Sequence, residues 1–450
     1  MIPPRRRGEC PSLVAPMPTG DGLLARITPA GATIPLAAMA GLCAAARRHG
    51  NGIIEVTSRG SIQIRGLTQS SAAAFADAVA QLDIEMIAGV PIAVAPLAGL
   101  EAGEAIDTAG LAASLREAIQ AADLRGRLAP KISVAIDGGS PLHLDALAAD
   151  VRLRASAGPD GPRLHVLLGG DAANATHLGT VAPGDAVEAV LRLLAVIAAR
   201  GPAARARSLL RTEGATPFNT AVADLLTASP AAPARPRAEA IGQHALRDEQ
   251  SALGIGLAFG HADAEALERL TDAAQKAQAC GFRTAPDRAL LVIGVSPEHM
   301  DALAAAAEDL GFMTNANDPR RSIAACPGAP ACACSDTPTR TLAPSAAKAL
   351  ASMLDGSLKV HLSGCVKGCA NPDAATLTLI GGKDVCAVIV NGTAQAEPLV
   401  TIPIQALIPA LARLGRVAAA ARQSDERAAA TLSRLGAAQI ASILAERVDG

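Results

Sequence analysis

The sequence predicts an α+β fold made of two similar halves, and three observations support this prediction. Residues 20–67 and 254–295 both follow the order strand, alanine-rich helix, glycine, strand and second strand. Their strand segments, such as IIEVT and LLVIGV, are rich in β-branched residues, and their helices carry apolar residues at three- and four-residue spacing. Residues 227–240 are proline-rich and lack periodicity, which indicates a linker between the halves.

Each half is predicted to contain a small α+β unit followed by a longer α/β segment. KISVAIDGG and RLHVLLGG supply strands to the first segment, and LTLIGG and VCAVIVNG supply strands to the second. The predicted boundaries are 13–85 and 86–226 for the first half, 227–240 for the linker, and 241–303 and 304–450 for the second half.

Composition and charge exclude several classes of function. The 450 residues are 50% apolar, contain no Trp or Tyr and carry a net charge of −2. Without aromatic stacking or a basic field, nucleic-acid binding is not expected. No run of 18 apolar residues lacks a charge, and MIPPRRRGECPS is not followed by an apolar segment. We therefore expect neither a membrane span nor a secretory signal, and a cytoplasmic location.

Five of the nine cysteines fall in two short loops rich in glycine and proline. Cys326 and Cys332 form a C-x5-C pair in ACPGAPACAC, and Cys365 and Cys369 form a C-x3-C pair in HLSGCVKGCANP. Such loops can curl around an iron–sulfur cluster that needs four converging thiolates. Structural zinc favours other spacings, but zinc and an inert group of thiols remain alternatives.

The other cysteines receive different interpretations. Cys334 lies two residues after Cys332 and is interpreted as a bystander or an alternate ligand. The remaining four lie in apolar or terminal contexts and are predicted to be ordinary small residues: Cys10, Cys43, Cys280 and Cys386.

The cysteine motifs resemble those of the sirohaem-dependent sulfite and nitrite reductases. That resemblance rests on C-x5-C followed by G-C-x3-C-x-x-P, and the fold it implies is a duplicated pair of ferredoxin-like and α/β units. Within this superfamily the two loops look most like those of the precorrin-3B synthases. PLAGL, LAPKISVAIDGG and TSRGSIQIRGL strengthen this likeness, which covers nearly the whole chain.

The resemblance implies a monooxygenase of cobalamin biosynthesis. Cys326, Cys332, Cys365 and Cys369 would hold a 4Fe–4S cluster, and O₂ would be used to hydroxylate precorrin-3A and close a γ-lactone. It also implies a mononuclear non-haem iron, for which His361 is a candidate but no ligand set is assigned. Because the sequence contains no dinucleotide fingerprint, we expect a separate electron-donor protein.

Departures from the reductase pattern bear on the alternative reading, a sirohaem-dependent sulfite or nitrite reductase. Arg59 and Lys131 match two of the basic residues that surround the anion in those enzymes. However, Ser133 replaces a second lysine, the arginine expected before Pro96 is absent, and Lys367 stands where the reductases typically carry Asn. A third alternative is a non-catalytic electron-transfer subunit.

Basic residues are the candidates for binding the carboxylate arms of a tetrapyrrole, because guanidinium groups bind carboxylates bidentately. The alternative for each of them is a solvated charge at a strand end. The predicted substrate-binding residues are Arg59, Arg65, Lys131, Arg283, Arg288 and Lys367.

Overall fold

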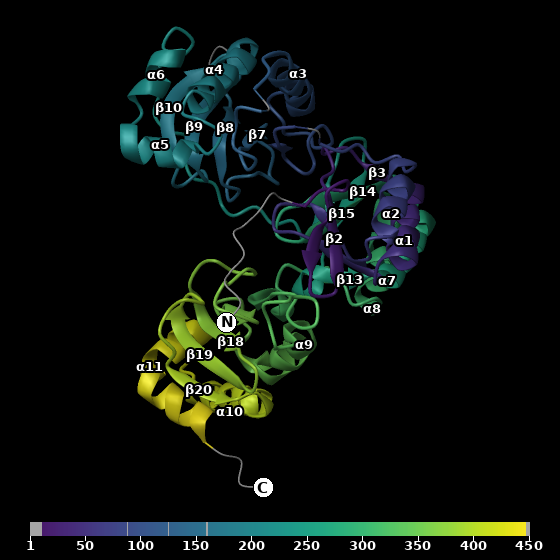
Figure 1. The fold of residues 1–450 in the computed structure, drawn as a ribbon, viewed down its shortest axis with the longest axis vertical. Coiled ribbons are helices and arrows are strands. Elements are labelled where there is room, and N and C mark those ends of the chain that lie inside the picture. The colour runs from purple at the N-terminus through teal and green to yellow at the C-terminus, as the bar shows by residue number, and fades with distance from the viewer. Residues whose placement is uncertain (1–10, 88, 125, 159–160, 447–450) are drawn as a thin grey trace.

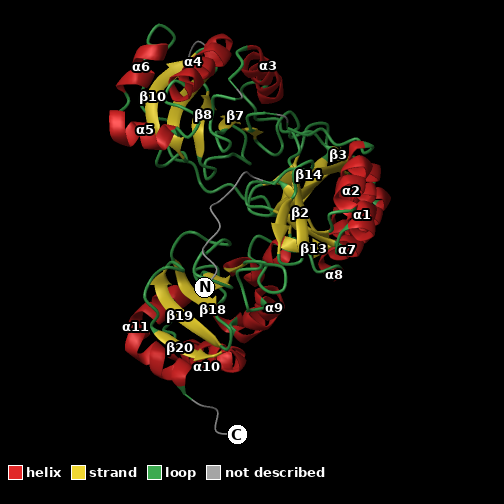
Figure 2. Ribbon diagram, viewed as in Figure 1, coloured by secondary structure: helices red, strands yellow, loops and turns green. Residues whose placement is uncertain are grey.

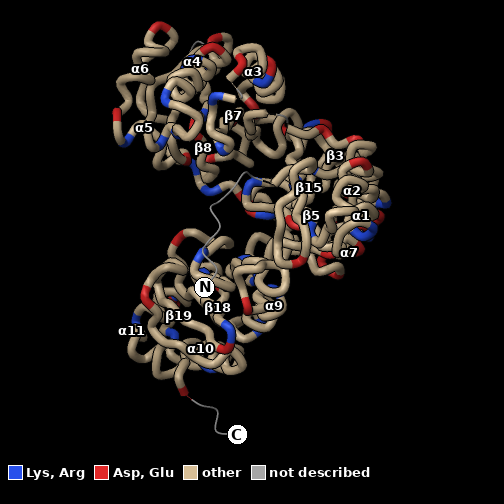
Figure 3. Tube along the Cα trace, in the orientation of Figure 1, with Lys and Arg blue, Asp and Glu red and all other residues tan. Residues whose placement is uncertain are grey.

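The computed structural model describes residues 11–87, 89–124, 126–158 and 161–446. Cys10 and the last four residues of the predicted segment 304–450 lie outside these ranges. The described chain forms three bodies, with a central unit between two α/β units (Figure 1). Acidic and basic residues are interspersed along all three bodies (Figure 3), in keeping with the small net charge.

The central unit contains two five-stranded sheets covered by helices on one side (Figure 2). Its helices are α1 (Leu36–His49), α2 (Ser71–Ala80), α7 (Ala264–Lys276) and α8 (Met300–Asp309). The first sheet has the order β1 (Met17–Thr19), β2 (Gly22–Ile27), β5 (Ile62–Leu67), β4 (Ile53–Val56), β13 (His261–Asp263). The second has the order β11 (Gly242–Ala245), β12 (Ser251–Gly256), β15 (Ala289–Val295), β14 (Gly281–Ala285), β3 (Ile34–Pro35).

The two halves of the central unit exchange a short strand. β13 comes from the second half of the chain but pairs antiparallel with β4, and β3 comes from the first half but pairs with β14. The helices of both halves pack in one core, in which Leu42 and Phe75 lie with Leu270 and Phe282. The two ferredoxin-like halves therefore form one folded body.

The two α/β units, one in each half of the chain, have the same topology. The first three strands of each pair parallel and the last two pair antiparallel. In the first unit these strands are β6 (Ile92–Val94), β7 (Val134–Asp137), β8 (Ala149–Ser156), β9 (Arg163–Gly170) and β10 (Thr176–Val181). In the second they are β16 (Ile323–Ala325), β17 (Val360–Ser363), β18 (Ala375–Gly381), β19 (Val385–Gly392) and β20 (Val400–Pro403). This repetition confirms the duplicated α+β fold.

Helices cover one face of each α/β sheet. They are α3 (Thr108–Ala121), α4 (Ala186–Ala198), α5 (Ala206–Glu213) and α6 (Thr216–Val222) in the first unit. In the second they are α9 (Thr339–Ala349), α10 (Leu407–Ala421) and α11 (Ala428–Ala445). Each unit has its own core, since Val151 packs in the first and Leu377 in the second. The strand residues that alternate with these core positions face the loops 138–148 and 364–374.

Two helical stretches of the described chain are long and apolar enough to cross a membrane by length and composition alone, Ile404–Ala421 and Ala428–Ala445. Leu411 of the first and Ile440 of the second lie in the core of the second α/β unit. The apolarity of both stretches therefore has a structural use in this fold, as packing surface for a sheet. The predicted lack of a membrane span stays a prediction.

The residues predicted as a linker run as extended chain along the first α/β unit. Thr227 pairs with Thr180 in β10. Farther along, Arg154 donates to the carbonyl oxygen of Pro233 at 2.7 Å, and Nε2 of His143 lies 2.8 Å from the carbonyl oxygen of Pro236. These contacts fix the segment to the first unit, and farther along Arg237 and Glu239 pair with Asp287 and Arg321 outside that unit.

Candidate functional site

The two cysteine loops meet because the strands that precede them are parallel neighbours. β16 leads into residues 326–334, and β17 leads into residues 364–372. The carboxyl ends of parallel strands lie at the same edge of a sheet, so the loops emerge together. The backbone N–H of Gly364 donates to the sulfur of Cys326 at 3.2 Å, which ties the second loop to the first.

Electrostatic interactions place the thiols of both loops around one point. Burial raises the pKa of the Cys332 thiol, a backbone hydrogen bond opposes this, and the nearby Cys334, Cys365 and Cys326 raise it further. The Nζ of Lys367 donates to the sulfur of Cys334 at 3.2 Å, and this bond, together with Cys365 and Cys369, raises the pKa of Lys367. The five cysteines of the two loops are therefore neighbours of Cys332 or of Lys367.

The spacing of these thiols fits a cluster better than a single zinc ion. Zn–S bonds of about 2.3 Å in a tetrahedron hold the sulfurs about 3.8 Å apart. Within the described ranges, the one group of three potential ligands whose atoms lie within 4.8 Å of one another contains no cysteine. A cubane cluster spreads its four thiolates around an iron–sulfur core and accepts a wider spacing.

Arg65 holds the first cysteine loop in place. It projects from β5, is 3% exposed, and donates to both carboxylate oxygens of Asp21 at 3.0 Å. It also donates to the carbonyl oxygen of Ala331, which accepts a second bond from the N–H of Gly20 at 3.2 Å. A Cβ at Gly20 would overlap the carbonyl oxygen of Pro330, so only glycine fits this close approach.

Arg283 plays the same part for the corresponding loop of the first α/β unit. It donates to the carbonyl oxygens of Ala98 at 2.8 Å and Pro96 at 3.2 Å, and to the hydroxyl of Thr33 at 3.0 Å. These carbonyls belong to PLAGL, which follows β6 as the first cysteine loop follows β16. Arg65 and Arg283 are thus occupied in positioning two related loops.

Arg59 and Arg288 lie on two hairpin loops that touch each other. The N–H of Asp287 donates to the carbonyl oxygen of Ser58 at 3.1 Å. From this junction Arg59 donates to the carbonyl oxygen of Ala148 in the first α/β unit at 3.1 Å. Arg288 reaches the second unit, where it donates to the carbonyl oxygen of Ala370 at 2.9 Å.

Lys131 lies at the same edge of the first α/β sheet as the contact of Arg59. It is exposed and precedes β7, and the N–H of Asp150 donates to the carbonyl oxygen of Ser133 at 3.0 Å where β8 begins. Ala148, which accepts from Arg59, comes just before that point. The structure therefore brings Arg59 and Lys131 to one edge of the first α/β sheet. It brings Arg288 and Lys367 to the second cysteine loop. Arg65 and Arg283 lie apart from both places, each holding a different loop.

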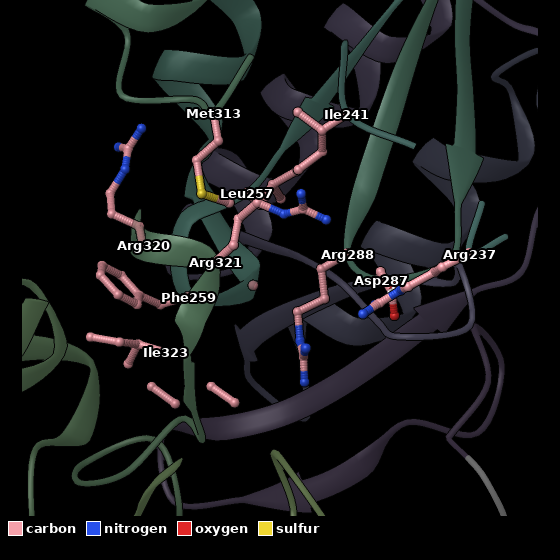
Figure 4. Close-up of a pocket in the computed structure, with 13 residues that line it drawn as sticks. Arg237, Ile241, Leu257, Phe259, Asp287, Arg288, Met313, Arg320, Arg321 and Ile323 are labelled. Carbon is pink, nitrogen blue, oxygen red and sulfur yellow. Dashed lines mark hydrogen bonds and ion pairs between the residues drawn. The ribbon is translucent and has the colours of Figure 1, made fainter. Parts of the chain in front are cut away.

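A cavity of about 130 Å³ lies beside Arg288 and the end of β16 (Figure 4). Three of its arginines have carboxylate partners: Arg237 with Asp287, Arg320 with Asp318 and Arg321 with Glu239. Arg288 has no carboxylate within 4.0 Å in the described part of the chain, and its side chain points away from Met313 and Ile241 in Figure 4. Burial lowers its pKa, so this guanidinium is poorly compensated.

A ligand set for a mononuclear iron is not assembled around His361. Its ring is fully buried on β17, and neither nitrogen has a hydrogen-bond partner among the described residues. The trio with suitable spacing is instead Asp137, His143 and Asp145, and both carboxylates there are ion-paired with Arg235. The described residues therefore do not fit a mononuclear iron site as they stand.

Sequence reasoning missed the residues that support the cysteine loops. Glu55 receives a hydrogen bond from Arg340 at the start of α9 and lies 3.6 Å from Arg65. Arg340, which follows the first cysteine loop, has its pKa lowered to about 10 by burial. An acidic residue inside the strand IIEVT was the available signal, because a buried carboxylate needs a cation.

Comparisons with known proteins agree with this architecture. Residues 15–82 match the nitrite/sulfite reductase ferredoxin-like half domain. A sulfite reductase [ferredoxin] 1 of Mycolicibacterium paratuberculosis is 26% identical over 157 residues, which are 33% of this chain and 28% of that protein. The structure of the Mycobacterium tuberculosis NirA protein superposes with a TM-score of 0.73 at 19% identity, over 93% of this chain and 84% of that one.

The most extensive of these sequence matches is to a precorrin-3B synthase of a Sinorhizobium species. It is 39% identical over 438 residues, which cover 97% of this chain and 94% of that protein. With the duplicated reductase-type fold and the paired cysteine loops, this identity shows that the chain is an enzyme and belongs to the precorrin-3B synthase family.

Proposed function

We propose that this enzyme converts precorrin-3A to precorrin-3B with O₂ in cobalamin biosynthesis. The observation that carries the proposal is the convergence of five thiols from two loops at one sheet edge, in a chain of this family. One oxygen atom enters the macrocycle as a hydroxyl group, and the ring-A acetate closes a γ-lactone. The other oxygen atom leaves as water, which requires two electrons and two protons from outside the substrate.

Cys326, Cys332, Cys365 and Cys369 are the proposed ligands of a 4Fe–4S cluster. When bound, such a cluster supplies electrons one at a time. The N–H of Gly364 supports the thiolate of Cys326, and Lys367 places a positive charge beside the group. A separate electron-donor protein in the cytoplasm would deliver the electrons to this edge.

Four of the six predicted basic residues would bind the carboxylate arms of the substrate. Arg59 and Lys131 lie at the edge of the first α/β unit, and Arg288 and Lys367 lie at the second cysteine loop. Each charge-assisted contact contributes about 1.5–3 kcal/mol, so loss of one should weaken binding roughly tenfold to a hundredfold. Arg65 and Arg283 act on binding indirectly, through the loops they hold.

The proposal is tested with protein purified without oxygen. We expect iron and acid-labile sulfide, a broad visible absorption, and conversion of precorrin-3A in which one atom of ¹⁸O₂ appears in the product. Each of the four ligand cysteines changed to Ser should abolish the absorption, whereas Cys334→Ser should leave it largely intact. Cys280→Ser is the control, because Cys280 is exposed and lies outside the cysteine loops.

Two results would contradict the proposal. Full iron and sulfide content in Cys369→Ser would show that Cys369 is not a ligand of the cluster. Stoichiometric extractable sirohaem, together with sulfite or nitrite reduction and no change in precorrin-3A, would favour the reductase alternative.

A further inference from the structure

Two side chains lie beside the residues that flank Cys369: buried His361 lies beside Gly368, and partly buried Arg288 donates to Ala370. We propose that His361 donates a hydrogen bond to the sulfur at Cys369, or to the adjoining sulfide of the bound cluster, and that His361 and Arg288 together raise its reduction potential. This inference rests on the proposed cluster, and it concerns positioning residues rather than ligands.

His361 lies directly beneath the second cysteine loop. Its ring carbon Cε1 is 3.5 Å from the place that a Cβ would take on Gly368, the residue before Cys369. The side chain is 0% exposed, and both ring nitrogens lack partners in the described structure. Leaving one buried polar group unpaired costs about 1–3 kcal/mol, so this placement calls for a partner that the chain itself does not supply.

The polar neighbours of His361 are already engaged elsewhere. The hydroxyl of Ser363 donates to the carbonyl oxygen of Cys365 at 2.7 Å, and that of Thr378 donates to Gly392 at 2.8 Å. Burial, with the charge of Arg288, lowers the pKa of His361 to about 4, so at neutral pH its ring carries one N–H donor. That donor is free for an acceptor entering from the loop side.

Arg288 approaches the same segment from the central unit. Its guanidinium donates to the carbonyl oxygen of Ala370, the residue after Cys369, at 2.9 Å. It is partly buried and forms no ion pair within 4.0 Å in the described ranges, although the neighbouring Asp287 attracts its charge from farther away. A Cβ at Gly260 would come within 2.7 Å of the Arg288 side chain, which shows how closely the backbone confines it.

The electrostatic consequence has a definite sign. A 4Fe–4S cluster bound by four thiolates is an anion, and it gains one more negative charge on reduction. Hydrogen bonds to its sulfurs and an adjacent guanidinium stabilise the reduced state more than the oxidised state. Removing either group should therefore shift the equilibrium toward the oxidised cluster.

A metal-ligand role for His361 has less support. A mononuclear ion needs at least two further ligands beside it, and His361 belongs to no group of three within 4.8 Å in the described part of the chain. A purely apolar packing role leaves two ring nitrogens unexplained, whereas the cluster offers several sulfur acceptors at once.

The test measures the reduction potential and the magnetic coupling of the cluster. In His361→Leu and in Arg288→Met we expect unchanged iron and sulfide content and a reduction equilibrium shifted about tenfold toward the oxidised form, which is about 59 mV for one electron. Thr378→Val is the matched control, because Thr378 pairs with His361 across β17 and β18 but binds Gly392. Its potential should stay at the parent value.

The parent protein gives an independent readout that does not depend on any variant folding. After labelling with ¹⁵N-histidine, pulsed EPR of the reduced cluster should show a weak histidine nitrogen coupling that is absent in His361→Leu. A normal cluster with no histidine coupling and an unmoved potential in both variants would overturn this inference alone. A parent protein without a cluster would overturn the proposed function, and this inference with it.

Discussion

The strand pair β7–β8 of the first α/β unit and the pair β17–β18 of the second have the same register, but different kinds of side chain project from them toward the covering loop. Val134 pairs with Val151 in the first unit, and Val360 pairs with Leu377 in the second. In this register, the residues facing the covering loop are Ala135, Asp137, Arg152 and Arg154 in the first unit, and His361, Ser363, Thr378 and Ile380 in the second.

The first unit closes this face with its own charges. Arg235 of the linker pairs with Asp137 and with Asp145, the latter at 2.6 Å. Arg152 is 0% exposed and donates to the carbonyl oxygen of Leu144 at 3.0 Å. The covering loop and the linker are thereby fixed to the sheet, and the carboxylates of Asp137 and Asp145 are both occupied by Arg235.

The second unit leaves the same face incomplete. Within the described chain both ring nitrogens of His361 lack a hydrogen-bond partner, and the loop above it carries the thiols of Cys365 and Cys369. The comparison teaches that one scaffold serves two purposes: the face crossed by buried ion pairs is structural, and the face with the unpaired imidazole suits the proposed cluster.

The largest expected effect on stability comes from breaking the ion pairs that Arg235 makes with Asp137 and Asp145 in the first unit. Arg235→Ala removes the cation that pairs with Asp137, whose side chain is 0% exposed, while Asp145 keeps Arg154 at 3.7 Å. We expect the free energy of unfolding to fall by about 3–5 kcal/mol, because a buried charge loses its compensation. Urea unfolding, followed by circular dichroism, measures this change.

Arg237 provides the control on the same linker. Its side chain is 66% exposed and its partner Asp287 is 53% exposed, so Arg237→Ala should cost less than about 1 kcal/mol. Asp137→Asn should recover part of the loss when combined with Arg235→Ala. Equal effects at Arg235 and Arg237 would mean that the network does not close the face of the first unit.

The next effect distinguishes the two loop-positioning arginines. Arg65→Met should destabilise the protein by about 3 kcal/mol, because Asp21 loses the bonds that lower its pKa against the effect of burial. It should also reduce iron and sulfide content, since the loop at Ala331 loses its support. Arg283→Met should weaken precorrin-3A binding but leave the cluster content normal. Cluster loss in both variants would show that the two loops are not independent.

A smaller effect, this time a gain in stability, is expected from replacing His361. In the protein without a cluster, His361→Leu should raise the free energy of unfolding by about 1–2 kcal/mol, since it removes a buried polar ring without partners. Chemical denaturation of the metal-free parent and variant measures this. A loss of stability instead would show that His361 already has a structural partner in that state.

The smallest effect is a pH dependence in the first unit. Nδ1 of His165 and Nε2 of His177 are 3.1 Å apart, and burial lowers the pKa of both, with the charges of His177 and Arg154 adding to the shift of His165. Below about pH 6.5 the unfolded chain takes up protons that the folded pair resists, so stability falls as pH falls.

Between pH 7 and pH 5 we expect a loss of about 1 kcal/mol, limited by solvent screening at the partly exposed His177. The double variant His165→Gln, His177→Gln should flatten this part of the profile. A decline of the same size in the double variant would assign the pH dependence to other groups.

Sequence patterns predicted the duplicated fold and the two cysteine loops because their signals are local. β-branched strands and alanine-rich helices repeat in a fixed order, and the cysteines lie in short glycine-rich loops. Strands β3 and β13 could not be predicted in the same way, since two or three residues carry no measurable periodicity and their partners lie in the other half of the chain.

The basic residues show the same limit more clearly. Arg65 and Arg283 have the residue type and strand position expected of carboxylate clamps, but only the folded chain brings Asp21, Ala331 and Ala98 to them. Arg235 was hidden in a proline-rich segment that indicated a spacer, because its partners lie 90 and 98 residues away. Long-range ion pairs depend on the fold as a whole and leave little trace in local sequence.

The exchange of β3 and β13 has a consequence for how the chain is made. The ribosome completes β5 at Leu67, but the strand that covers the edge of β4 ends at Asp263, 196 residues later (263 − 67). At about 5–20 residues per second, synthesis of that interval takes roughly 10–40 s. Throughout this time the nascent sheet exposes β4 as an open edge, the kind of surface that pairs with other chains. Slow translation, or a chaperone bound near this edge, would therefore influence the yield of folded enzyme far more than either α/β unit, whose strands all lie within one half of the chain.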